Sequence, residues 1–63
     1  YLKINSNNVI REINIFLIDG RLIYYNNVSQ NETTIDLTTF KKGTYIVRMI
    51  LDEEVVVRKI VVK

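Results

Sequence analysis

The 63-residue chain contains no cysteine, no histidine and no proline. Without cysteine it can form neither a disulfide nor a thiolate metal site. Without histidine it lacks the commonest general base and the commonest metal-ligating side chain. A domain of this length buries only about 60% of the surface that its unfolded chain exposes. We therefore predict a marginally stable domain held together by apolar packing, with no bound metal and no cofactor.

Charge and hydropathy exclude further classes. The chain has 9 basic and 7 acidic residues, and a net charge of +2 is too small to indicate nucleic acid or an anionic membrane as a partner. No apolar run approaches the roughly 18 residues that a membrane span needs, so no membrane insertion is expected. The chain opens directly on the strand-like Tyr1-Leu2-Lys3-Ile4 and not on a cleavable signal. We interpret residues 1–63 as one domain, a fragment of a longer protein.

The chain consists of short apolar segments, rich in β-branched residues, that alternate with polar turn residues. The segments are Leu2–Ile4, Ile10–Ile18, Arg21–Val28, Thr34–Leu37, Thr44–Leu51 and Val55–Val62. About six strands at a spacing of roughly 8–12 residues, without a helical period, are typical of an all-β sandwich or barrel. In the last segment we expect Ile60 and Val62 to face inward.

The segments that connect the predicted strands contain residues that favour turns. Asp19-Gly20 between two apolar runs predicts a two-residue type I′ hairpin, which would pair Leu17 with Leu22 and Ile15 with Tyr24. Asparagine and serine bond their own backbone and favour turns. Turns or polar connections are accordingly predicted at Asn5–Asn8, Ser29–Thr33, Thr38–Lys42 and Asp52–Glu54.

No group of residues predicts catalysis. Asp52, Glu53 and Glu54 fall in a predicted turn, where carboxylates are normally solvated, whereas general acid–base chemistry needs them to converge in a cleft. Ser6 and Ser29 have no histidine to activate them. The chain's glycines are isolated and are explained as turn residues. We therefore predict no catalytic residue and no enzyme.

The tyrosines allow two interpretations. Tyr24 and Tyr25 lie near Arg21, and Tyr45 lies near Arg48. These groups could form a stacking platform for single-stranded nucleic acid on a small barrel. The alternative is that Tyr24 and Tyr45 belong to the core, with their hydroxyl groups at its rim. We favour the core.

Three motifs in order resemble a known family. The first runs from Ile13 to Tyr24 around Asp19-Gly20-Arg21, the second from Ile35 to Arg48 around Gly43-x-Tyr45, and the third from Arg58 to Lys63. Together they resemble the type A C-terminal sorting domain of the type IX (Por) secretion system of Bacteroidetes, and the resemblance covers nearly all of the chain. The chain also ends on a strand, and a terminus frays unless something ties it down. We expect that end to be recognised by another molecule.

The resemblance implies an immunoglobulin-like antiparallel β-sandwich of six to seven short strands that catalyses nothing. It implies an upstream cargo, recognition by the outer-membrane translocon and export to the cell surface or the medium. A sortase-like cysteine protease would then remove the domain, often joining the cargo to anionic lipopolysaccharide. By motif match, the signal residues would be Gly20, Arg21, Gly43, Tyr45, Val47, Lys59, Ile60, Val61, Val62 and Lys63.

The chain departs from the family at its start, where members usually carry a Tyr-Pro-Asn-Pro-like stretch before the first strand. We expect that first strand to be missing here, either trimmed or lost, and a homodimer or strand exchange to follow from the open edge. The alternative function is an immunoglobulin-like or fibronectin-like accessory or adhesion module that binds carbohydrate or spaces domains.

Overall fold

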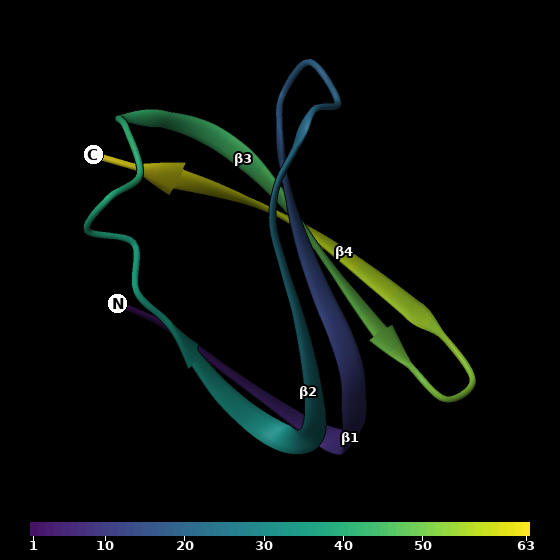
Figure 1. The fold of residues 1–63 in the computed structure, drawn as a ribbon. Coiled ribbons are helices and arrows are strands. Elements are labelled where there is room, and N and C mark those ends of the chain that lie inside the picture. The colour runs from purple at the N-terminus through teal and green to yellow at the C-terminus, as the bar shows by residue number, and fades with distance from the viewer.

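The computed structural model describes all of residues 1–63 as one antiparallel sheet of four strands (Figure 1). The strands are β1 (Leu2–Leu17), β2 (Leu22–Ile35), β3 (Gly43–Leu51) and β4 (Val55–Val62). Their order across the sheet is β2-β1-β3-β4, so β2 and β4 form its two edges. The all-β prediction is confirmed. No helix of the structure could cross a membrane.

The strand count differs from the prediction because two polar segments bend strands without ending them. Asn5–Asn8 lies inside β1, and Ser29–Thr33 lies inside β2. The β1–β2 register shifts between Asn5 and Ile10, and Ser29 adopts a positive φ of 57°. The local side-chain-to-backbone hydrogen bonding that was expected here is present, since the Asn8 N–H donates to Ser6 Oγ at 3.2 Å. It produces β-bulges, so four strands, two of them bent, replace about six short ones.

The bends double the sheet over on itself, as the lower part of Figure 1 shows. A short limb pairs Leu2–Asn5 with Glu32–Ile35, and a long limb follows beyond the bulges. Ile4 and Ile35 from the short limb belong to the same buried cluster as the rest of the core. That cluster contains Ile4, Ile10, Ile13, Ile15, Ile35, Tyr45 and Val47. The core therefore lies between two layers of one open sheet, and two separate sheets of a sandwich are not present.

The hairpin at Asp19-Gly20 is confirmed, but its loop is longer than predicted. The Leu17 N–H donates to the Arg21 carbonyl at 2.8 Å, and the Gly20 N–H donates to the Leu17 carbonyl at 2.8 Å. Gly20 has a φ of 96°, whereas Asp19 is not in the positive-φ region. A type I′ turn needs positive φ at both central residues, so the loop is instead Ile18–Gly20 closed by a bulged glycine.

The longer loop changes the register near the turn. Ile15 faces Tyr24 as predicted, but Leu22 faces Phe16 and not Leu17. Leu22 is consequently 50% exposed, so it contributes little to the core.

The second hairpin follows the prediction. The turn at Asp52–Glu54 joins β3 to β4, and Ile60 and Val62 pack against the core cluster. Only 9 of the 63 residues are buried, which fits the small core and marginal stability expected for a chain of this length.

Candidate functional site

The signal residues suggested by the motifs gather at one end of the sheet. Gly20 and Arg21 form the tip of the β1–β2 hairpin, Gly43 begins β3, and Val62 faces Gly43 from the end of β4. An open depression of about 580 Å³ separates the hairpin tip from the segment before β3. Its lining includes Ile18, Ile23, Phe40, Lys41, Lys42 and Gly43.

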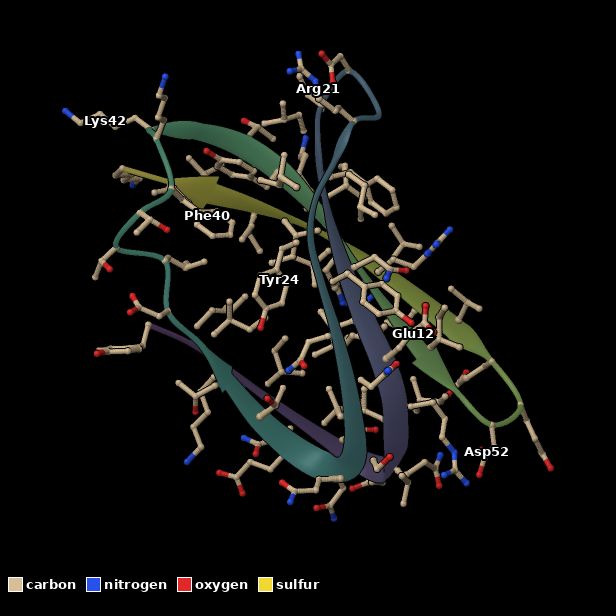
Figure 2. The ribbon with its side chains drawn as sticks, in the orientation of Figure 1. Glu12, Arg21, Tyr24, Phe40, Lys42 and Asp52 are labelled. Atoms are coloured by element: carbon tan, nitrogen blue, oxygen red, sulfur yellow. The ribbon has the colours of Figure 1, made fainter.

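The same end carries cations, so we call it the basic end and define it by Arg21, Lys41, Lys42 and Lys63. Figure 2 places Arg21 and Lys42 there, above Phe40. The Arg21 N–H donates to Asp19 Oδ1 at 3.0 Å, and Arg21 Nη2 lies 3.5 Å from Asp19 Oδ2. That contact holds the hairpin tip while leaving the arginine largely exposed.

The opposite end of the molecule is acidic, because the β3–β4 turn consists of Asp52, Glu53 and Glu54. Arg11 donates from Nε to Asp52 Oδ1 at 2.5 Å and from Nη2 to Asp52 Oδ2 at 3.2 Å. The hydrogen bond from Arg11 lowers the pKa of Asp52 below its usual value, and the same contact raises the pKa of Arg11. Both side chains are more than half exposed, so solvent screens the pair and its effect on stability is small.

Two of the predicted signal residues are buried and hold β3 in the core. Tyr45 is 4% exposed and faces Leu17 on β1 and Ile60 on β4. Its hydroxyl donates to the Lys41 carbonyl, and its ring centroid lies 5.3 Å from that of Phe40. Val47 is 2% exposed. Tyr45 and Val47 therefore present almost no surface to a partner molecule.

The remaining signal residues divide between half-buried and exposed positions. Ile60 and Val62 are half-buried against the core. The exposed ones are Gly20, Arg21, Gly43, Lys59, Val61 and Lys63. Gly20 and Gly43 have φ angles of 96° and 151°, and a Cβ at either position would meet no atom within 4 Å. The backbone conformation therefore favours glycine there, although space is available.

Tyr45 is a core residue and Tyr24 packs against the core, as predicted. Tyr24 is half-buried, and its ring lies 6.5 Å from Phe40, which also contacts Tyr45. The arginines have other partners, since Arg21 bonds Asp19 and Arg48 lies 5.1 Å from the centroid of the Phe16 ring. The arginine–tyrosine pairs considered for a stacking platform do not form.

Sequence reasoning missed a polar chain on the outer face of the sheet. Asn14 is 2% exposed, and its Oδ1 accepts from Arg48 Nε at 3.1 Å and from Arg48 Nη2 at 2.8 Å. Asn14 Nδ2 donates to Glu12 Oε2 at 3.4 Å, and the Tyr25 hydroxyl donates to Glu12 Oε1 at 3.4 Å. Figure 2 shows Glu12 on this face. The chain crosses three strands, and only the alternation of Glu12 and Asn14 along β1 hinted at it.

No group of three or more acidic side chains converges in a way that could hold a metal ion. The two serines considered as nucleophiles have backbone roles, since Ser6 accepts from Asn8 and Ser29 forms the bulge in β2.

The fold and the site thus define a small all-β domain whose exposed motif residues lie mainly at one end. Comparison with known proteins identifies its family: residues 1–63 match the secretion system C-terminal sorting domain. The chain belongs to this family, and the resemblance to type IX secretion sorting domains is confirmed. No curated protein and no solved structure matches the chain.

Membership in this family indicates the general role of the domain. The domain is a C-terminal secretion sorting signal, which implies an upstream cargo and the type IX secretion machinery as partners. It also implies export across the outer membrane, to the cell surface or into the medium. Sorting domains of this family are typically non-catalytic.

Proposed function

We propose that residues 1–63 deliver an upstream cargo protein through the type IX translocon and are then removed by a sortase-like protease. The observation that carries the proposal is the family match over the full length of the chain. In this role the domain catalyses nothing and acts only as a surface to be recognised.

The recognised surface consists of the exposed signal residues. Because Tyr45 and Val47 are buried, their contribution is to position β3 and, through Ile60, the end of β4. The translocon then contacts Lys59, Val61 and the residues of the basic end. Their exposure supports this assignment, and so does the position of Lys41 and Lys42 in the lining of the depression.

Recognition through the edge of the sheet is the physical mechanism that fits best. β4 pairs with β3 on one side only, since it is the last strand of the sheet. An extended segment of a partner could add to this edge through backbone hydrogen bonds, while side-chain contacts give selectivity.

One contact of Tyr45 supports a relationship to immunoglobulin-like sandwiches. In such folds a tyrosine at the start of a strand bonds the backbone a few residues upstream, as the Tyr45 hydroxyl does with Lys41. β3 pairs with β1 only from Ile10 to Leu17, so the outer side of Leu2–Asn5 has no strand beside it. We propose that one further strand pairs there and completes a second sheet. If a second copy supplied that strand, a strand-exchanged dimer would result.

The secretion role is tested with a reporter protein fused upstream of the chain in cells that have a type IX system. Deleting Lys59–Lys63 would remove the strand segment opposite Tyr45, so a loss of delivery could reflect unfolding. The sharper variant is Lys59→Ser with Val61→Ser, because both side chains are exposed. Its matched control is Lys3→Ser with Val9→Ser, an exposed lysine and valine outside the motifs.

We expect both variants to keep the thermal stability of the parent chain, and only the motif variant to retain the reporter inside the cell. Normal surface delivery of the motif variant would refute the role of Lys59 and Val61. Removal by a sortase is tested separately by the mass of the delivered reporter. A delivered reporter that still carries all 63 residues would refute that step.

A further inference from the structure

The two edges of the sheet differ in how well they are protected. β2 is interrupted by register shifts and by the positive φ of Ser29. β4 pairs with β3 in one unbroken register from Val55 to Val62 and contains neither glycine nor proline. A straight, regular, apolar edge strand is the kind that pairs with another chain.

The β3–β4 register identifies which backbone N–H and C=O groups of β4 do not bond β3 and could bond another chain. The Leu51 N–H donates to the Glu54 carbonyl at 2.9 Å, and antiparallel ladders bond through alternate residues. Even-numbered residues of β4 therefore bond to β3, while the odd-numbered residues direct their N–H and C=O groups to the open edge. These are Val55, Val57, Lys59 and Val61. Arg58 Nη1 donates to the Val57 carbonyl at 3.1 Å, so only an exposed side chain covers that group.

Charge is distributed along this edge in a self-complementary way. Glu53 and Glu54 lie in the turn just before β4, and Arg58 and Lys59 follow within the strand. A second copy that pairs antiparallel with this edge has its acidic and basic residues in the reverse order, so opposite charges can face each other. We propose that two copies of the chain pair through β4, with the two-fold axis at Val56. This register sets Arg58 opposite the partner's Glu54 and Lys59 opposite the partner's Glu53.

Registers whose axis is shifted toward the end of β4 are worse. The backbone requires odd-numbered residues to meet odd-numbered residues, so the axis must fall on a residue. An axis at Val57 leaves Arg58 and Lys59 opposite valines. An axis at Arg58 sets this arginine opposite the partner's Arg58, and like charges directly opposite destabilise a strand pair. With the axis at Val56, the exposed Val55 also meets the partner's Val57, which adds apolar contact on the outer face.

The dimer is expected to be weak. Pairing through one short edge buries much less than the roughly 1,200 Å² at the low end of stable interfaces, so a Kd on the order of 0.1–1 mM is expected. Salt should weaken the association further, because the ion pairs are exposed. The inference does not depend on secretion, and its test uses the purified 63-residue chain.

Single cysteines test the register, since the natural chain has none. Residues at a non-hydrogen-bonded position face each other at a Cα separation of about 4.5 Å, within reach of a disulfide. Mild oxidation at high concentration should link Val56→Cys chains into covalent dimers and leave Val57→Cys chains mostly monomeric. Efficient linking of Val57→Cys chains, or no linking of either variant, would overturn the proposed axis.

Charge reversal tests the contacts by sedimentation equilibrium. Glu53→Lys with Glu54→Lys, and separately Arg58→Glu with Lys59→Glu, should each weaken self-association at least about tenfold. An equimolar mixture of the two variants restores all four opposite pairs and should associate at least as well as the parent chain. A dimer that persists in both separate variants would be held elsewhere, for example by strand exchange, and would contradict the proposal.

Discussion

The Tyr45 hydroxyl donates a hydrogen bond to the carbonyl of Lys41, four residues upstream. The bond fixes the segment that leads into β3 against the tilted ring pair of Tyr45 and Phe40. It thereby positions the lysines of the basic end beside the hairpin tip. One buried signal residue thus determines where the exposed ones lie.

Removing this hydroxyl should destabilise the domain. Tyr45→Phe keeps the ring but leaves the Lys41 carbonyl without its donor, which we expect to cost about 1 kcal/mol. For a domain of this size, that loss lowers Tm by roughly 4–8 °C. Tyr25→Phe is the control, because the Tyr25 hydroxyl bonds only side chains at exposed contacts, Asn27 at 3.1 Å and Glu12 at 3.4 Å. Equal losses in the two variants would show that the contact with Lys41 has no special structural role.

The bend of β2 should depend on Ser29. Its φ of 57° lies in the left-handed region, where β-branched side chains are strained. We expect Ser29→Val to cost about 1–2 kcal/mol and Ser29→Gly to be neutral or slightly stabilising, measured by urea unfolding. If valine were tolerated as well as glycine, the bulge would not be the element that doubles the sheet over.

Stability should fall in acid through two aspartates. The Thr38 N–H donates to Asp36 Oδ1 at 2.9 Å, and this backbone hydrogen bond lowers the pKa of Asp36 below its ordinary 3.8. Arg11 lowers the pKa of Asp52 in the same direction. A carboxylate whose folded pKa is depressed stabilises the fold above its unfolded pKa, and that stability is lost as the pH falls through the folded value.

Asp36→Asn should therefore reduce the difference in urea midpoint between about pH 6 and about pH 2. The variant is expected to be less stable than the parent chain at the higher pH and to match it at the lower one. Glu53→Gln in the exposed turn serves as the control. A parent chain and Asp36→Asn variant with the same acid dependence would rule out a contribution from Asp36.

The sequence predicted the all-β class, the Asp19-Gly20 hairpin and the inward face of β4, because each depends on neighbouring residues. It did not predict the path of β1 and β2. Asn5–Asn8 has the same local chemistry whether it ends a strand or bends one, and only the partner strand decides between them. The contact between Asn14 and Arg48 was missed for a related reason, since the two residues are 34 positions apart and meet only through the β1–β3 register.

The candidate signal residues were found through motif order, but their separate roles required the fold. Tyr45 and Val61 are both motif positions, yet the first is 4% exposed and the second is 59% exposed. Alternation along an apolar run such as β4 indicates its two faces but not how deeply each residue is buried, because valine occupies both faces. Burial distinguishes the residues that build the domain from those that another molecule can contact.

The most direct test of the sorting role is the fraction of a fused reporter that reaches the cell surface, measured by its accessibility to added protease. The reporter should be accessible only when it carries residues 1–63 and the cells have a working type IX system. It should remain protected when either one is absent. Equal surface exposure in cells that lack the type IX system, or none in cells that have it, would contradict the assignment.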